Sequence, residues 1–116
     1  MSEIPRPAPE GALNWSPAEA RELGDQALDI WTELLVRLHD DLPVARNRSA
    51  ADVADAVALP IPGEPMPTDD LVEHLRQVVF KESMYPGHPG FVAYISGAGT
   101  VPGVAADLIA AGLNQN

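Results

Sequence analysis

The stretch that decides the fold is SPAEARELGDQALDIWTELLVRLHDD, residues 16–41. It opens with a capping box, in which the hydroxyl of Ser16 and the carboxylate of Glu19 satisfy backbone N–H groups at a helix start. Apolar residues then recur at steps of three and four, which places them on one face of a helix. These residues are Leu23, Ala27, Ile30, Trp31, Leu34, Leu35 and Leu38. The stretch therefore predicts one long amphipathic helix that ends near Asp40, shortly before Pro43.

A second, shorter helix and an extended spacer are expected next. Ser49 and Asp52 repeat the capping pattern, and apolar residues follow on one face until Pro60. Four prolines then fall within eight residues, a density that helices and central strands do not tolerate. Residues 60–67 are therefore predicted to run extended.

A third helix is predicted after the proline spacer. Thr68 or Asp69 is expected to cap it, because both side chains accept hydrogen bonds from backbone N–H groups at a helix start. The helix is expected to end near Ser83. Its buried stripe is predicted to be Leu71, Val72, Leu75, Val78 and Val79.

The last third of the chain predicts a turn, a strand, a loop and a helix, in this order. The sequence Tyr-Pro-Gly-His-Pro-Gly at residues 85–90 is typical of a turn, and the apolar run at residues 91–95 predicts a short strand. Small residues at 96–100 predict a loop, and helical spacing of apolar residues continues from there to the last residues. Because no glycine cap or polar tail comes after it, we expect the chain to be a piece of a longer protein.

The charge of the chain excludes several classes of partner. There are 17 acidic residues against 7 basic ones, which gives a formal net charge of −10. Nucleic acids and anionic membranes attract clustered Lys and Arg, and the basic residues are scattered along this sequence. The absence of cysteine excludes disulfides and thiolate catalysis. With neither a basic start nor an apolar signal stretch at the N-terminus, we expect a cytoplasmic location.

The composition predicts a thin core. Most of the apolar residues are small or aliphatic, only six are aromatic, and twelve prolines interrupt long elements. Residues 1–15 contain three of these prolines and are expected to form an extended leader. A mostly helical arm that docks on something larger fits this composition better than an independent compact domain.

Residue types that often carry chemistry have structural explanations here. The small residues 97–100 before a helix can attract an anion, but they match no phosphate-binding motif, and a tight turn or a close approach by a ligand or second chain explains them as well. His39, His74 and His88 are spaced too far apart to share a helix turn, so we expect no metal site at these histidines. Lys81, the only lysine, is expected to be a cation at the end of the third helix.

The C-terminal third resembles a known family. The matching residues are Gly87-His88-Pro89-Gly90-Phe91-Val92-Ala93-Tyr94-Ile95, then Gly97-Ala98-Gly99-Thr100, Pro102, Ala106-Asp107-Leu108 and Leu113-Asn114-Gln115-Asn116. This pattern is similar to the N-terminal part of pyridoxal-phosphate-dependent decarboxylases of the aromatic-L-amino-acid decarboxylase type, the group II decarboxylases. Those proteins carry a His-Pro-x-Phe-x-x-Tyr segment, a small-residue loop, and a helix that contains Ala-Asp-Leu or Ala-Asp-Met. The match is good over about thirty residues, and the layout of the helices upstream also agrees.

The resemblance implies an organisation for the whole chain. After the leader, residues 16–84 correspond to a helical dimerisation arm that wraps the partner subunit of a homodimer. Residues 85–116 correspond to a strand, a small-residue loop and the first helix leading into the pyridoxal-phosphate-binding domain of a fold-type I enzyme. The implied fold class is therefore mostly α: three helices, a short strand and a further helix.

The resemblance also implies residues at the substrate site. Tyr94, Ile95, Ser96 and Gly97 match the segment at the end of the strand that lines the substrate pocket, and Asn116 falls where the partner subunit contributes a side chain. The animal enzymes usually carry Pro-Thr at the positions of Ser96 and Gly97. A hydroxyl contact to the substrate is therefore missing here, and the glycine leaves more room.

The catalytic groups of the family lie beyond this chain. The lysine that forms the aldimine, the histidine that stacks on the cofactor and the aspartate that faces its pyridine nitrogen all lie downstream, and Lys81 does not stand in such a motif. We therefore expect no catalytic or cofactor-binding residue in this segment, with pyridoxal phosphate held by the complete enzyme. The alternative is a stand-alone acidic helical interaction module without catalysis. A related cofactor-dependent lyase with another reaction is a third interpretation.

Overall fold

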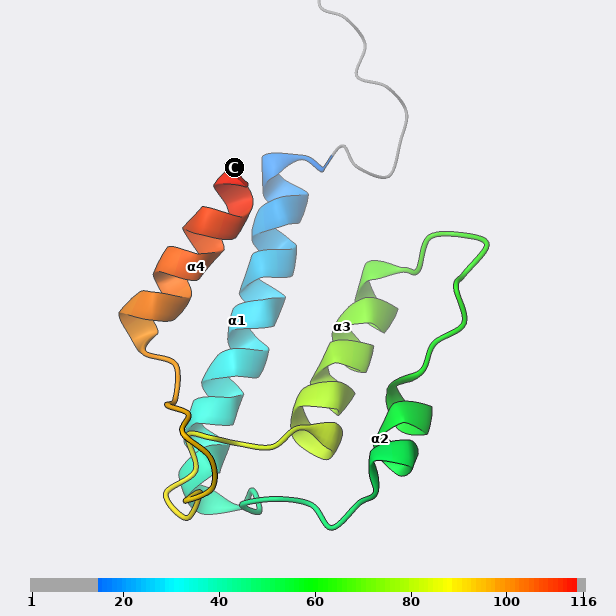
Figure 1. The fold of residues 1–116 in the computed structure, drawn as a ribbon. Helices are drawn as coiled ribbons and strands as arrows, with labels where there is room; N and C mark the ends of the chain where they lie inside the picture. The colour runs from blue at the N-terminus through cyan, green and yellow to red at the C-terminus, as the bar shows by residue number, and fades with distance from the viewer. Residues whose placement is uncertain (1–14, 115–116) are drawn as a thin grey trace, which may run out of the picture.

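The computed structural model of this chain describes residues 15–114, which are mostly helical. The elements are α1 (Pro17–Asp40), α2 (Ala50–Val57), α3 (Thr68–Gln77), a short π-helical segment η1 (Val78–Glu82) and α4 (Val101–Leu113). Figure 1 shows α3 between α1 and α2, with α4 on the other side of α1. The predicted mostly helical fold class is confirmed, whereas all of the predicted leader except Trp15 lies outside the described residues.

The long helix α1 begins and ends where the sequence predicts. Ser16 Oγ accepts a hydrogen bond from the N–H of Glu19 at 3.2 Å, and the Glu19 carboxylate accepts one from the N–H of Ser16 at 2.7 Å. These two bonds form the predicted capping box. The last turn is held by Arg37, whose guanidinium pairs with Asp41 at 3.0 Å. Local sequence therefore fixes both ends of α1.

The helix α2 is also capped as predicted, but α3 is not. Ser49 and Asp52 form a second capping box at the start of α2. At the start of α3, Pro67 occupies the N-cap position and no side chain caps the helix. The predicted cap at Thr68 or Asp69 is therefore wrong, because both residues already lie inside the helix. Asp69 lies in the first turn instead, where a carboxylate stabilises the positive end of the helix dipole.

The last turn before Ser83 widens into the π-helical segment η1. Ser83 has extended backbone angles, so the predicted end of this helical stretch is confirmed. Its hydroxyl donates a hydrogen bond to the carbonyl of Val78 at 3.0 Å, and the Tyr85 hydroxyl donates one to the carbonyl of Val79 at 2.9 Å. Two side chains from beyond the helix therefore satisfy carbonyls near its C-terminal end.

The hydrophobic core is small and lies where α1 meets α3 and η1. Its buried residues come from the second half of α1, from η1, and from the residues just after each of them. They are Ile30, Leu38, Leu42, Phe80 and Tyr85. Five buried side chains are few for residues 15–114, which agrees with the thin core expected from composition.

Charged side chains complete the core around the ring of Phe80. The Cζ atom of Arg37 lies 4.7 Å from the ring centroid, and that of Arg76 lies 5.9 Å from it. Glu33 accepts hydrogen bonds from both arginines, so one carboxylate links α1 to α3. The aliphatic stems and guanidinium groups of the arginines thus cover an aromatic face that the apolar residues leave open.

The strand predicted at residues 91–95 is wrong. This segment has no strand conformation, and no strand occurs elsewhere among residues 15–114. Tyr94 has a φ of 63°, in the left-handed region that no extended strand contains. Val92 and Ile95 are almost fully exposed. A strand is stabilised by hydrogen bonds to a neighbouring strand. None of the described residues forms a strand beside this segment.

The helix α4 stands apart from the other helices. Its N-cap is Thr100, whose hydroxyl accepts a hydrogen bond from the N–H of Gly103 at 3.2 Å, and Asn114 caps its C-terminus in the left-handed conformation. No Cα of α4 lies within 8 Å of a Cα in another described helix. Among the described residues, none of the helices combines the length and apolar character needed to cross a bilayer.

Replacement of Phe80 by alanine tests the assignment of the core. We expect Phe80→Ala to lower the free energy of unfolding by about 3–5 kcal/mol, because it removes the ring that α1 and both arginines pack against. Urea titration followed by circular dichroism measures this loss. Ile61→Ala, at a residue that is 98% exposed, is the control and should leave the transition unchanged. A Phe80→Ala transition equal to that of the control would contradict the assignment.

The pH dependence of stability tests the link made by Glu33. The hydrogen bond from Arg76 holds the pKa of the Glu33 carboxyl below its ordinary value. Such a carboxyl stabilises the fold above its unfolded-state pKa of about 4.3, and the contribution is lost as the pH falls through the folded-state pKa. We therefore expect Glu33→Gln to lower the thermal midpoint near neutral pH, by an amount that shrinks as the pH falls from about 5 towards about 2.

Melting curves of Glu33→Gln and the parent over this pH range measure the effect. Glu22→Gln, which replaces an exposed carboxylate on the same helix, is the matched control. A loss of stability that stays constant with pH would assign the effect to packing and not to the ionised carboxylate.

Candidate functional site

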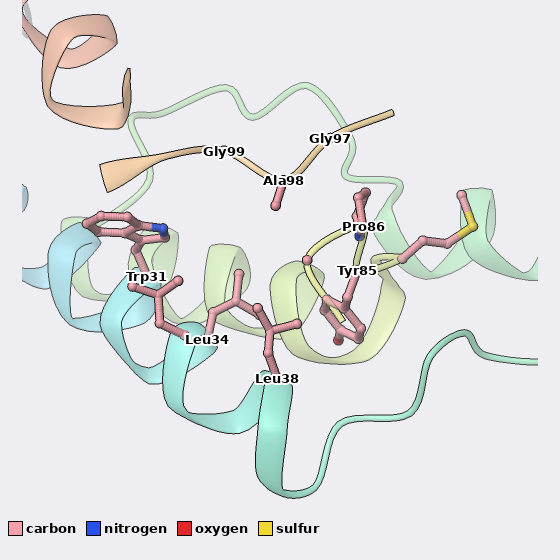
Figure 2. A pocket seen from close by; sticks show the side chains of 11 residues that line it. Trp31, Leu34, Leu38, Tyr85, Pro86, Gly97, Ala98 and Gly99 are labelled. Carbon is pink, nitrogen blue, oxygen red and sulfur yellow. The ribbon is translucent and has the colours of Figure 1, made fainter. Parts of the chain in front are cut away.

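The predicted loop of small residues faces α1 across a pocket. The pocket lies between the second half of α1, the turn that follows η1, and residues 97–99, and its volume is about 190 Å³. Figure 2 shows Trp31, Leu34 and Leu38 on one side and the Gly97–Gly99 segment across from them, with the Ala98 methyl group between. The lining is apolar, and the pocket is below the roughly 300 Å³ at which drug-sized ligands are held. Its size suits a single side chain or part of a substrate.

The turn at residues 85–90 directs the chain back over α1. The N–H of His88 donates to the carbonyl of Tyr85, and the N–H of Phe91 donates to the carbonyl of His88, both at 2.9 Å. The Nδ1 atom of His88 also accepts a hydrogen bond from the N–H of Gly90 at 2.9 Å. The predicted turn is confirmed, and its histidine stabilises the turn itself.

The structure separates the predicted substrate-site residues. Gly97 lines the pocket, whereas Tyr94 and Ile95 are strongly exposed, at 79% and 108%, and Ser96 is exposed beside them. The Tyr94 ring lies 6.4 Å from that of Phe91, centroid to centroid. Asn116 lies outside the described residues. Among residues 15–114, the exposed segment that ends at Ser96 therefore does not line the pocket that Gly97 borders.

The loop at residues 97–100 forms a capped helix start. Thr100 already accepts a hydrogen bond from the first turn of α4, and no basic residue lines the pocket beside the loop. Gly97 does not have a positive φ, and a Cβ atom built on it meets no atom within 4 Å. The loop therefore does not depend on a left-handed glycine at position 97. The remaining open space is available to a ligand or to another chain.

A second pocket collects basic residues that are far apart in the sequence. Arg46, Arg48 and Lys81 line it together with Glu82. Arg46 donates a hydrogen bond to the carbonyl of Phe80, 34 residues away, and Arg48 pairs with Glu82 across the same separation. These cations are scattered along the sequence, and only the fold gathers them into a cluster. No sequence signal links residues so distant along the chain.

Two carboxylates near helix ends are held in their ionised form by neighbouring side chains. The hydrogen bond from Arg37 holds the pKa of Asp41 below its ordinary value, and the hydrogen bond from the Ser49 hydroxyl does the same for Asp52. Both carboxylates favour the ionised form for structural reasons. Within residues 15–114, no three histidine or carboxylate side chains come together as metal ligands.

Comparisons with known proteins add no relative. No family model matches the chain, and no curated protein or solved structure matches it either. Function is therefore inferred from the residues and from their arrangement.

Two glycine substitutions test the described course of the loop. We expect Gly97→Ala to keep or slightly raise the unfolding free energy, by up to about 1 kcal/mol, because its backbone accepts a side chain and the unfolded chain loses freedom. Gly90→Ala is the contrast, since its Cβ would lie 2.9 Å from Val44 Cγ2 and 3.3 Å from His88 Nδ1. We expect it to lose about 1 kcal/mol or more. Urea titrations of both variants measure these changes. Equal losses of unfolding free energy in the two variants would contradict the placement of residues 90 and 97.

Proposed function

We propose that this chain is the N-terminal dimerisation and substrate-channel segment of a pyridoxal-phosphate-dependent amino-acid decarboxylase that works as a cytoplasmic homodimer. The resemblance of residues 87–116 to the aromatic-L-amino-acid decarboxylase type suggests the family. The single structural observation that carries the proposal is the uncovered apolar surface of α4.

The helix α4 has the composition of a buried helix. Asp107 is the only charged residue among its thirteen. Its apolar side chains are nevertheless exposed, with Leu108 at 70% and both Ile109 and Leu113 at 63%. A helix that is apolar on all sides is normally packed on all sides. This supports a larger body around α4, supplied by the rest of the enzyme and by a second subunit.

The segment before α4 also exposes apolar side chains. Val92 is 94% exposed and Ile95 is fully exposed, although both are aliphatic. Contiguous exposed apolar residues mark interaction surfaces in soluble proteins. In the proposed enzyme they pack on the catalytic body, and Tyr94 supplies a phenol hydroxyl near the substrate.

The described residues do not fit pyridoxal phosphate itself. The cofactor needs a lysine, a phosphate cradle and an acid facing its ring nitrogen. Lys81 lies in the second pocket, where the one lining acid, Glu82, is paired with Arg48, and the small-residue loop lies in the other pocket. In the proposal, the remainder of the enzyme therefore holds the cofactor, and residues 94–97 form part of the channel wall.

A stand-alone interaction module is the second candidate. The same exposed surface of α4 favours it, because an apolar helix on an acidic chain also suits a partner protein. The two candidates require different sequences after Asn116. A decarboxylase requires a large α/β region with a catalytic lysine, whereas a module requires none.

The decisive experiment uses the protein encoded by the whole reading frame. We expect it to sediment as a dimer and to release carbon dioxide from an amino acid. Gly97→Leu should raise KM or abolish turnover, because its side chain enters the open space beside the loop. The thermal midpoint should stay within roughly a few degrees of the parent.

Gly97→Ala is the matched control, since it adds one methyl group and should keep most of the activity. Normal kinetics in Gly97→Leu would remove Gly97 from the substrate channel. A reading frame that ends without a lysine-bearing region, or a full-length protein without decarboxylation of any amino acid, would favour the interaction module.

A further inference from the structure

The second pocket is built from three separate parts of the chain. The connector after α1 contributes Arg46 and Arg48, α2 contributes Ala50, Val53 and Ala54, and the end of η1 contributes Lys81. Its volume is about 550 Å³, within the range of roughly 300–1,000 Å³ typical of small-molecule sites. One wall is a π-helical segment, a conformation that recurs at functional sites.

The cations of this pocket make few hydrogen bonds and ion pairs to other residues of the fold. Arg48 pairs with Glu82 and donates to the carbonyl of Asp52 at 2.9 Å. Arg46 donates to one carbonyl, although a guanidinium has five N–H donors. Within the described part of the chain, neither Arg46 nor Lys81 forms an ion pair. Two positive charges without a carboxylate partner therefore border one pocket of a strongly acidic protein.

The overall negative charge does not cancel this local field. At physiological ionic strength the Debye length is about 8 Å, so exposed acids farther away are largely screened. Glu82 is the one acid that lines the pocket, and its side chain is only 11% exposed and paired with Arg48. The unpaired cations therefore dominate the mouth of the pocket.

The rest of the pocket selects the kind of anion. Its remaining surface is largely apolar, from Ala50, Val53, Ala54 and Met84. A free phosphate would leave oxygens without donors against these side chains, which is unfavourable. A carboxylate with an apolar body satisfies both parts of the pocket.

We propose that the pocket between α2 and η1 binds small amphipathic carboxylates, with the carboxylate at Arg46 and Lys81 and the apolar body against α2. This site is separate from the pocket that Gly97 lines, and it does not rest on the proposed decarboxylase. The carboxylate would receive charge-assisted hydrogen bonds from both cations.

Nuclear magnetic resonance of the nitrogen-15-labelled full chain tests this proposal, with phenylpropionate as the probe. We expect saturable shifts in the amides of Val53, Ala54 and Lys81, with a dissociation constant on the order of 1 mM or below. Acetate lacks the apolar body and phenylpropanol lacks the charge, so both should bind at least about fivefold more weakly. Inorganic phosphate should also bind more weakly.

Lys81→Gln is the diagnostic variant, because Lys81 is exposed and without an ion pair among residues 15–114, so its loss should leave the fold intact. We expect it to weaken phenylpropionate binding about fivefold or more. Arg21→Gln removes the same charge from a remote exposed site on α1 and should bind as the parent does. Equal binding by these two variants would overturn the proposal. Shifts outside the pocket, or equal affinity for the alcohol and the acid, would also overturn it.

Discussion

The packing of Phe80 against α1 positions the rest of the described structure. Its ring is one of only five buried apolar side chains among residues 15–114, and Arg37 and Arg76 cover its face from two helices. Glu33 accepts hydrogen bonds from both arginines and so fixes the spacing of α1 and α3. A core this small cannot exclude water by apolar residues alone, and the arginine side chains complete it.

Both pockets are consequences of this junction. On one side, Tyr85 is buried beside Leu38 and bonded to the carbonyl of Val79, which directs the following turn and its loop over α1. On the other side, Arg46 reaches the carbonyl of Phe80 and brings the connector towards η1. The well-packed part of the chain therefore holds two small sites, while α4 carries apolar surface that nothing in residues 15–114 covers. This division suits a segment that docks on a larger body.

The sequence by itself determined the helices. The capping boxes at Ser16 and Ser49 and the cap at Thr100 join residues three positions apart, so their hydrogen bonds form in any helix that starts there. The turn at residues 85–90 is local in the same way. The wrong cap predicted for α3 moved the predicted helix start by only a residue or two. The last of the prolines before the helix marks where the extended spacer ends. The assignment of Gly97 to a substrate pocket, which the resemblance implies, stays a prediction.

The tertiary structure decided the interactions between residues that are distant in sequence. A strand at residues 91–95 needs a partner strand, and its own apolar residues cannot reveal that the described chain lacks one. Arg46 and Lys81 meet at one pocket only because Phe80 packs on α1 and carries η1 to the connector. The spacing of apolar residues shows which side of a helix is apolar, but it does not show which other element that side packs against. Contacts that close long loops are chosen by the packing of the whole chain, since many pairings have similar local propensity.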